Sequence, residues 1–400
     1  MRVALINQFY PPAQAPTGIL LQDLARTLQQ RGHRVTVVTS AGIYAQGAGE
    51  RATPAETGIE VHRVGSRRRH RTGVFAKLLD YVRFFLAANR VLAGLAPAPA
   101  VVVCMTTPPF CGVIGARRMK RRGTPCMLWC MDLYPEAIAA NGWIRPGSLA
   151  AGLLYRLARW ERTAAAAVIT LGPDMTVRVR SAAPAATIVE VPVWSRLRSD
   201  DAAQAAARAL RRERGWRDDE TVLLYSGNMG RAHSVARFVA LADAAGRAKA
   251  GIRFVFCGSG PSADGWRAAG GAAFEWLSPV RDDLLVPHLL AADVHLLSQR
   301  VGWTGVVVPS KYQAACALGR PVVFDGPAES SVAQWIRAGD TGWVLGDDEA
   351  PDALLAALQN RERIAGKGCR AYQQAERLFS CAINAGRIAD AIERMGGPGV

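Results

Sequence analysis

Lys311 stands in a stretch whose residue types could bind a phosphate. The three valines at 306–308 are typical of a buried strand, and the chain then presents Pro309-Ser310-Lys311 before apolar residues return at helical spacing. We expect a helix to begin here, with Ser310 as its N-cap and the N–H groups of its first turn directed outward. Such a terminus attracts anions, and a lysine beside it favours a phosphate. The plainer alternative is a capped helix whose lysine is solvated.

Strand-like and helix-like runs alternate along the whole chain. The elements that they predict must hold the 306–311 stretch in place. With 400 residues, half of them hydrophobic, the chain can form two cores. The runs RVALIN, LLQDLARTLQQRG and HRVTVVTS predict a βαβ unit, and ETVLLYSGN, GIRFVFCGSGP, ADVHLLSQ and GRPVVFDG repeat the alternation. The sequence predicts an α/β fold of two Rossmann-like doubly wound domains, over 1–192 and 193–375, facing a central cleft. A C-terminal helix over 376–400 can return to the N-terminal domain.

Open α/β sheets bind ligands beyond the carboxyl ends of their strands, so the loops there are the candidate sites. Glycine, serine, lysine and acidic residues concentrate in these loops, although some of the glycines and prolines are explained by turns alone. In the first domain the loops are 7–18, 106–110 and 132–136, and in the second they are 227–233, 258–261, 298–311 and 325–330.

The charge of the chain is strongly positive and unevenly distributed. The formal net charge is +16, and between residues 60 and 125 only Glu60 and Asp80 oppose a series of lysines and arginines. Such a surface can meet nucleic acid, an anionic membrane or a diphosphate substrate. Because the basic clusters lack interleaved aromatic residues and no nucleic-acid-binding module is visible, we expect no nucleic-acid partner.

Residues 73–95 predict a helix with a broad apolar face. Its four charged residues, which share one arc, argue against a transmembrane span. The basic run GSRRRHR directly before it is typical of a segment near anionic headgroups, so 63–95 are predicted to contact an anionic membrane surface. The alternative is a helix that simply packs on the sheet. The N-terminal MRVALI lacks the features of a signal peptide, which favours a cytoplasmic protein, peripheral on the inner face of the membrane.

The eight cysteines indicate no metal site. None forms a Cys-x-x-Cys pair, most lie in apolar runs, and the close pair Cys126 and Cys130 lacks further ligands at zinc spacing. We therefore expect buried free thiols and no structural metal.

Four segments together carry a family likeness. They are NQFYPPAQAPTGILLQDLARTLQQRGHRVTVVTS, WCMDLYPEAIAANGWIRPGSLAAGLLYRLARWERTAAAAVITLG, LLYSGNMGRAHSV and VVVPSKYQAACALGRPVVFDGP. In this order they resemble family 4 glycosyltransferases of the GT-B fold, nearest to the branch that builds cell-surface polysaccharides and colanic-acid-like polymers. The likeness extends over nearly the whole chain, so it is more specific than a single glycine-rich loop.

The resemblance implies a retaining glycosyltransferase that needs no metal or cofactor. A nucleotide-diphosphate sugar, with UDP favoured, would bind the C-terminal domain, and a glycan acceptor, such as a polyprenyl-diphosphate-linked one, the N-terminal domain. The departing diphosphate gains negative charge, so cations and N–H groups suit the site better than a strong nucleophile. The resemblance implies catalytic roles for Asp132, Arg231 and Lys311. The implied donor-binding residues are Gly18, Gly227, Asn228, Gly230, Arg231, Gly258, Ser310, Lys311, Gln313, Glu329 and Ser330.

The chain departs from the family pattern at two places. Gly305 and Gln313 stand where most relatives carry two glutamates, so the first carboxylate is absent and Gln313 is left to bind a ribose. Asn228 stands at the usual arginine, with Arg231 and His233 nearby. Glu329 and Ser330 could take over sugar contacts, or they form a surface loop.

On the acceptor side, the resemblance implies a catalytic or orienting role for Asp132, which follows the apolar run PCMLWCM, with Glu136 as a weaker companion. Asp132 could instead initiate a turn. Two other functions remain open: a nucleotide-sugar 2-epimerase of the same fold, and a non-catalytic paralogue that binds nucleotide.

Overall fold

The computed structural model describes residues 1–13, 15–41, 58–65, 74–346 and 351–397. The chain divides into two compact units, each of which is an α/β domain. The first comprises Met1–Pro192 together with Gly305–Val307 and Cys381–Val400, and the second comprises Val193–Thr304 and Val308–Ser380. The last division falls at Cys381 rather than at residue 376 because helix α14 (Arg361–Leu378) continues past that point.

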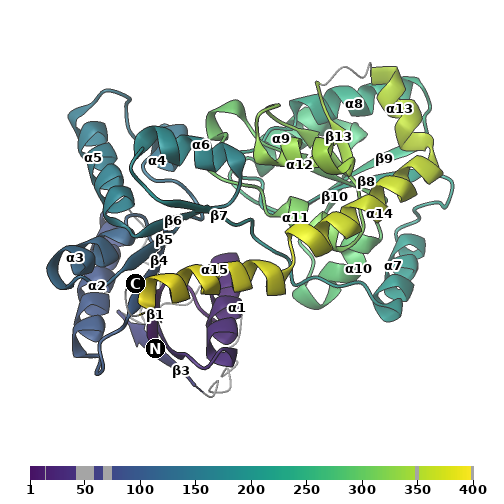
Figure 1. The fold of residues 1–400 in the computed structure, drawn as a ribbon. Coiled ribbons are helices and arrows are strands. Elements are labelled where there is room, and N and C mark those ends of the chain that lie inside the picture. Colours follow the sequence, from purple (N-terminus) through teal and green to yellow (C-terminus); the bar gives the residue numbers. More distant parts are fainter. Residues whose placement is uncertain (14, 42–57, 66–73, 347–350, 398–400) are drawn as a thin grey trace. The chain divides into compact units, whose positions relative to one another are not determined.

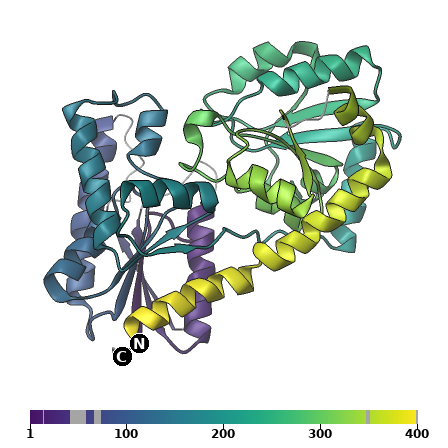
Figure 2. The ribbon, with the colours of Figure 1, turned by 45° about the horizontal axis from the view of Figure 1, so that its top comes forward.

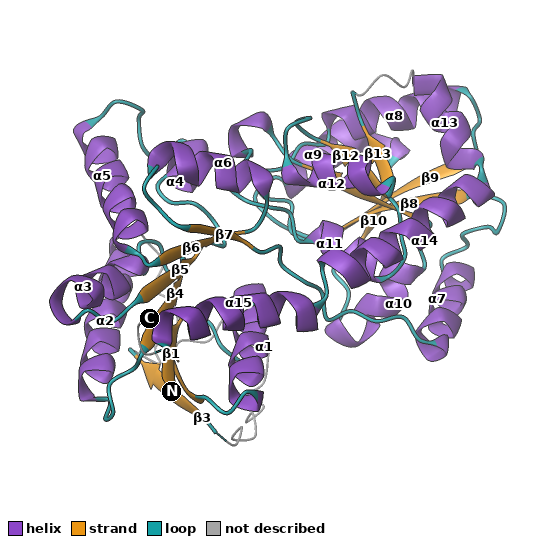
Figure 3. Cartoon of the chain, viewed as in Figure 1, coloured by secondary structure: helices purple, strands orange, loops and turns teal. Residues whose placement is uncertain are grey.

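The first unit is built on a seven-stranded sheet in the order β3-β2-β1-β4-β5-β6-β7 (Figure 3). All its strand pairs are parallel, and β1, β4 and β5 are almost entirely buried. The strands are β1 (Arg2–Ile6), β2 (Arg34–Ser40), β3 (Ile59–Val64), β4 (Val101–Met105), β5 (Cys126–Trp129), β6 (Ala167–Thr170) and β7 (Ile188–Glu190).

Helices cover both faces of this sheet (Figure 1). On one side α1 (Pro16–Gln30) packs against α15 (Cys381–Gly396), and Arg31 and His33 bind acidic residues of α15 at 2.6 Å and 2.8 Å. On the other side lie α2 (Val74–Gly94), α3 (Gly112–Arg122) and α5 (Leu149–Ala164). Two shorter helices are α4 (Glu136–Ala140) and α6 (Pro173–Ala182). The C-terminal helix thus belongs to the first unit.

The second unit has a six-stranded parallel sheet in the order β10-β9-β8-β11-β12-β13. Its strands are β8 (Thr221–Ser226), β9 (Ile252–Cys257), β10 (Glu275–Leu277), β11 (Val294–Ser298), β12 (Val322–Asp325) and β13 (Gly342–Val344). Its helices are α7 (Asp201–Glu213), α8 (Ala236–Arg247), α9 (Ala263–Gly270), α10 (Leu285–Leu290), α11 (Lys311–Ala317), α12 (Ser331–Gly339), α13 (Pro351–Gln359) and α14. Figure 2 shows helices on both faces of this sheet. The prediction of two Rossmann-like domains is confirmed.

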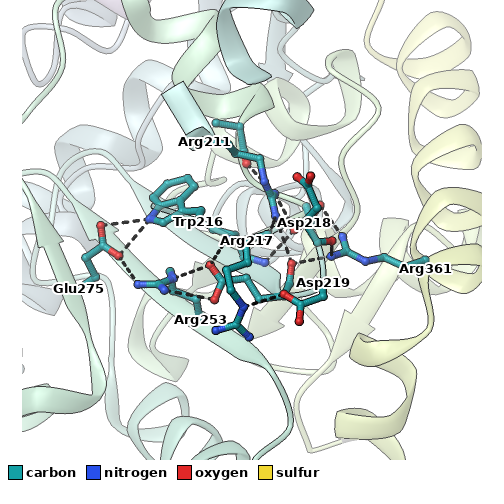
Figure 4. Close-up of polar contacts among 12 residues, drawn as sticks. Arg211, Trp216, Arg217, Asp218, Asp219, Arg253, Glu275 and Arg361 are labelled. Atoms are coloured by element: carbon teal, nitrogen blue, oxygen red, sulfur yellow. Dashed lines mark hydrogen bonds and ion pairs between the residues drawn. The ribbon is translucent and has the colours of Figure 1, made fainter. Parts of the chain in front are cut away.

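A network of hydrogen bonds and ion pairs joins helices α7 and α14 to the amino-terminal ends of the strands in the second sheet (Figure 4). Asp293 accepts from Arg211 at 2.9 Å and from Arg361 at 3.0 Å, which ties α7 and α14 to the start of β11. Arg253 of β9 pairs with Glu220 at 2.8 Å. A cavity of about 240 Å³ lies beside this network and is lined in part by Arg211, Asp293 and Arg361. Since nucleotide-binding loops follow the carboxyl ends of strands, we interpret this network as structural.

The predicted strand at 306–308 is wrong. Val307 forms only an isolated antiparallel bridge with Asp132, and Val306 accepts a backbone hydrogen bond from Leu133 at 2.9 Å. The segment is short, lying between a turn at 304–306 and the start of α11, so Val306 and Val308 are buried and Val307 is partly buried without joining a sheet. Hydrophobicity predicted the burial correctly, but burial alone does not make a strand.

Candidate functional site

Lys311 is held against the end of strand β8. Its Nζ donates a hydrogen bond to the carbonyl oxygen of Asn228 at 3.2 Å and lies 3.8 Å from the centre of the Tyr225 ring. The Tyr225 hydroxyl donates to the same carbonyl at 3.0 Å. An ammonium over an aromatic face is attracted by the ring quadrupole, so Tyr225 fixes the position of the lysine head group. Sequence reasoning missed Tyr225, which ends an apolar strand run directly before Ser-Gly-Asn.

The Lys311 ammonium has no acidic partner within the described ranges. Burial lowers its pKa to about 7, because desolvation disfavours the charged form. At neutral pH the group is therefore divided between its charged and neutral forms. An anion placed beside it would restore the charge, which is the behaviour expected of a lysine that binds a phosphate.

Two glycines let the loops after β8 and β9 approach each other closely. Gly258 has φ 149°, and a Cβ atom there would lie 2.0 Å from the carbonyl oxygen of Gly227. Gly227 has φ 124°, and a Cβ atom on it would lie 2.8 Å from Cε of Lys311. Gly230 follows in the same loop, where a Cβ atom would lie 3.3 Å from Nδ2 of Asn228. Gly227 and Asn228 thus contact Lys311, and Gly258 packs on Gly227 at a distance that a side chain would not allow.

The remaining side chains of the 227–233 loop differ in exposure. Asn228 and Arg231 are exposed, whereas His233 is partly buried with Nδ1 2.5 Å from the carbonyl oxygen of Ser298. Burial, with a smaller contribution from Lys311, lowers the pKa of His233 to about 4. His233 is therefore neutral at physiological pH and donates from Nδ1 to that carbonyl. Arg300, which sequence reasoning also missed, donates to the His233 carbonyl at 2.8 Å.

Ser310 does not play its predicted role, and Gln313 is buried with a side-chain amide that is unpaired within the described residues. Ser310 occupies the N-cap position of α11, but its backbone is helical and its exposed side chain makes no capping hydrogen bond, so the predicted capping role is wrong. Gln313 is completely buried, and neither its Oε1 nor its Nε2 has a hydrogen-bond partner among the described residues. Leaving a buried amide unpaired is costly, so Gln313 is a candidate contact for a polar ligand.

Glu329 and Ser330 lie beyond β12. Glu329 is exposed, and its backbone carbonyl accepts from the Gln334 side chain at 2.7 Å. Ser330 is buried and acts as the N-cap of α12, accepting from the Ala333 N–H at 3.3 Å and donating to the Pro327 carbonyl at 2.8 Å. The Ser330 hydroxyl therefore has a structural task that explains its presence without a ligand.

In the first unit, Asp132 lies just beyond β5. Its backbone N–H donates to the Thr106 hydroxyl at 3.3 Å, and its carboxyl group is hydrogen-bonded to Tyr134. Burial raises the pKa of Asp132 to about 6, and the contact with Tyr134 opposes part of this rise. A carboxyl group with this pKa at the carboxyl edge of a parallel sheet can exchange protons near neutral pH.

Glu136 is committed to a buried ion pair. Both of its carboxylate oxygens accept from Arg162 of α5 at 2.9 Å, and Arg162 also donates to the Tyr134 carbonyl at 2.9 Å. Both side chains of the pair are almost completely buried. The pair fixes α4 to α5 and holds the backbone next to Asp132, so the structure gives Glu136 a positioning role rather than a free carboxylate.

Gly18 lies in the first turn of α1 rather than in a loop, so that part of the prediction is wrong. A Cβ atom on Gly18 would lie 3.1 Å from backbone atoms of Phe9 and Tyr10, so the chain itself occupies the space. Gly305, at φ 67°, donates its N–H to Asp174 at 3.1 Å within the first unit. Its positive φ favours glycine at this position.

No group of three or more histidine, cysteine or acidic side chains in the described ranges is arranged to hold a metal ion. Within the same part of the chain, no helix has both the length and the apolar character that crossing a bilayer requires.

Comparison with known proteins gives consistent matches. Residues 18–194 match the glycosyl transferase 4-like domain. The chain is 23% identical over 394 residues to the putative colanic acid biosynthesis glycosyl transferase WcaI of Escherichia coli (strain K12), a match that covers 95% of this chain and 96% of that protein.

Solved structures share the fold. Sucrose-phosphate synthase from Thermosynechococcus elongatus has a TM-score of 0.75 at 14% identity, covering 99% of both chains. Anabaena Alr3699/HepE, solved in complex with UDP, has a TM-score of 0.65 at 14% identity, covering 98% of this chain and 100% of that one. At these identities the likeness establishes the fold alone.

Proposed function

We propose that this chain, which has the GT-B fold and matches the glycosyl transferase 4-like domain over residues 18–194, is a glycosyltransferase that transfers a sugar from a nucleoside-diphosphate sugar to a glycan acceptor in polysaccharide synthesis. UDP is the favoured nucleotide, and the reaction proceeds with retention and without a metal or cofactor. The relative WcaI is described as a colanic acid biosynthesis enzyme, which supports this class of product.

The observation that carries the proposal is the setting of Lys311. Its ammonium lies over Tyr225, beside the tightly apposed Gly227 and Gly258 loops, and lacks a carboxylate partner among the described residues. A diphosphate placed there would meet a cation whose charge is not neutralised by the protein. Since the leaving nucleotide gains negative charge as the glycosidic bond breaks, such a cation stabilises the transition state. Arg231, which is exposed in the same loop, is the proposed second cation.

The buried side-chain amide of Gln313, which has no hydrogen-bond partner among the described residues, supports a donor site on the second unit. We propose that its amide binds a hydroxyl of the ribose, replacing the carboxylate that most relatives have there. Glu329 remains a proposed sugar contact because it is exposed beyond a strand end, whereas the capping role of Ser330 makes it a weaker one. A non-catalytic nucleotide-binding protein is the second candidate, because Gly305 leaves no carboxylate at the first glutamate position.

Nucleotide affinity should depend on pH through Lys311. The pKa of about 7 in the free protein means that, above this pH, a diphosphate binds together with a proton. We expect the Kd of UDP to rise by up to roughly tenfold per pH unit between about pH 7 and pH 9, and Lys311→Met to lose this dependence. Calorimetry in buffers of different ionisation enthalpy measures affinity and proton uptake together. A wild-type affinity that stays constant over this range would contradict the assignment.

For the acceptor side we propose Asp132 as the residue that orients the acceptor hydroxyl or accepts its proton. Asp132→Asn should lower kcat by about 100-fold or more while leaving the affinity for the nucleotide unchanged. Because the carboxylate is the active form and its pKa is about 6, the wild-type rate should fall as the pH drops below 6. Transfer assays and nucleotide titrations test this, with Asp243→Asn, exposed on α8 of the second unit, as the control. Equal loss of nucleotide affinity in Asp132→Asn would remove Asp132 from the acceptor side.

The acceptor we propose is a glycan on a lipid diphosphate, with the protein peripheral on the inner face of the membrane. Helix α2 supports this, because it exposes Leu78, Leu86 and Arg83. Of the predicted membrane-contacting stretch 63–95, Arg67, Arg68, Arg69 and Arg71 lie outside the described residues. The proposal for 63–95 therefore rests on α2 and on the sequence of the basic run.

A further inference from the structure

Large apolar side chains are exposed on α5 and on the loop that leads into it. Leu149 is 95% exposed, and Trp143 and Leu153 are each 69% exposed. We call these three residues the α5 apolar face. Single exposed leucines are ordinary, but a tryptophan and two leucines that are all strongly exposed within eleven residues favour a binding surface.

Two large apolar residues of α5, Leu149 and Leu153, lie on the side of the helix that is exposed to solvent. Leu149, Leu153 and Arg156 follow one another at i, i+4 and i+7, so they share one side of α5. The small residues Ala151 and Ala158 are buried on the other side. A helix that only covered a sheet would show the reverse arrangement, with its large apolar residues inward.

The charged side chains within residues 143–159 are all positive. Arg145, Arg156 and Arg159 are exposed, and none of their guanidinium groups forms a hydrogen bond or ion pair with the described residues. The acidic residues that flank this stretch, Glu136 and Glu161, are both buried. Apolar side chains ringed by free arginines match the chemistry of an anionic bilayer, which offers acyl chains below negative headgroups.

Helix α3, on the same side of the sheet as α5, also exposes basic side chains. Helix α3 packs between α5 and α2, and Figures 1 and 2 show the three helices along one side of the first unit. The exposed cations of α3 are Arg117, Lys120, Arg121 and Arg122. Each helix runs antiparallel to the strands that it connects, so α5 begins at the carboxyl edge of the sheet, where Asp132 lies. A bilayer against this side would bring lipid close to the proposed acceptor edge.

We propose that the α5 apolar face, with Arg145, Arg156 and Arg159, docks on an anionic lipid bilayer and that Trp143, Leu149 and Leu153 enter the interface. This extends the membrane contact of the proposed function to a second element, but it does not depend on the reaction. A second copy of the chain fits less well, because pairing this face with itself would bring unpaired arginines together without any exposed carboxylate to balance them.

The test is co-sedimentation of the purified full chain with vesicles, without donor or acceptor. Vesicles of phosphatidylcholine alone are compared with vesicles that also contain phosphatidylglycerol. Leu149→Gln with Leu153→Gln should weaken partition onto the anionic vesicles by roughly tenfold or more. Arg156→Gln with Arg159→Gln should weaken it in a salt-dependent way. The controls are Ile383→Gln, 45% exposed on α15 across the sheet, and Arg208→Gln, exposed on α7.

We expect the wild type to bind only vesicles that contain phosphatidylglycerol. Both α5 variants should lose this binding, and the controls should keep it. Equal partition of the leucine variant and the wild type, or no binding of the wild type to anionic vesicles, would overturn the proposal. Sedimentation velocity distinguishes the alternative occupant: a wild-type dimer that the leucine variant converts to monomer would identify the face as a self-association surface. Because no sugar transfer is measured, these outcomes leave the proposed reaction untouched.

Discussion

Replacing Lys311 with alanine is expected to weaken binding of UDP by about 1.5 to 3 kcal/mol, which is roughly 10- to 150-fold. The loss corresponds to one charge-assisted hydrogen bond to a diphosphate. The protein should remain folded, because the Lys311 ammonium donates one hydrogen bond, to the Asn228 carbonyl, and forms no ion pair with the described residues. Calorimetric titration of wild type and variant measures the change.

A control variant and a control ligand test whether the loss of affinity is specific to Lys311 and to the diphosphate. Lys120→Ala removes an exposed lysine of α3 and should leave nucleotide affinity unchanged. Uridine, which has no phosphate, should lose little affinity in Lys311→Ala, because the lysine is assigned to the diphosphate and not to the base. An unchanged Kd for UDP in Lys311→Ala would mean that the lysine only packs against Tyr225.

Breaking the Glu136–Arg162 pair should have the largest effect on stability. Arg162→Met leaves the Glu136 carboxylate buried with neither of its two guanidinium hydrogen bonds. We expect the free energy of unfolding of the first unit to fall by about 3 to 5 kcal/mol, because an uncompensated buried charge remains. Chemical denaturation followed by circular dichroism measures this, with exposed Arg159→Met on the same helix as the matched control.

The double variant separates a structural role of Glu136 from an acceptor-binding role. Glu136→Gln combined with Arg162→Met removes both charges and should recover part of the lost stability. If Glu136→Gln alone left stability intact but abolished transfer, Glu136 would be an acceptor contact and its assignment as a positioning residue would be incorrect.

The sequence predicted the architecture well because periodicity and strand-end chemistry are local signals. Each run of valine, isoleucine and leucine that forms β1, β4, β8 or β11 is bounded by glycine, proline or polar residues. The valines at 306–308 show the limit, since an apolar run between two turns is buried without pairing as a strand. The start of α11 at Lys311 followed from the same local reasoning, although Ser310 does not cap it.

The sequence predicted which residue types lie at the candidate site, but it did not predict which side chains contact one another there. Glycine spacing indicated that loops 227–233 and 258–261 approach a ligand, and the structure shows Gly258 tight against Gly227. Nothing local to Glu136 identifies Arg162, 26 residues later, as its partner. Likewise Tyr225 and Lys311 are far apart in sequence, and only tertiary packing places the ammonium on the ring. Long-range pairs of this kind decide which polar residues are free to bind ligands.

The central claim is that a nucleoside diphosphate binds at Lys311 on the second unit. The most direct measurement is the Tm of the purified chain with UDP, GDP, dTDP and ADP, each beside its monophosphate, for wild type and Lys311→Ala. The account predicts that at least one diphosphate, UDP foremost, raises the Tm of the wild type more than its monophosphate does, and that Lys311→Ala loses this difference. A folded wild type that no diphosphate stabilises, or an equal rise in Lys311→Ala, would contradict it.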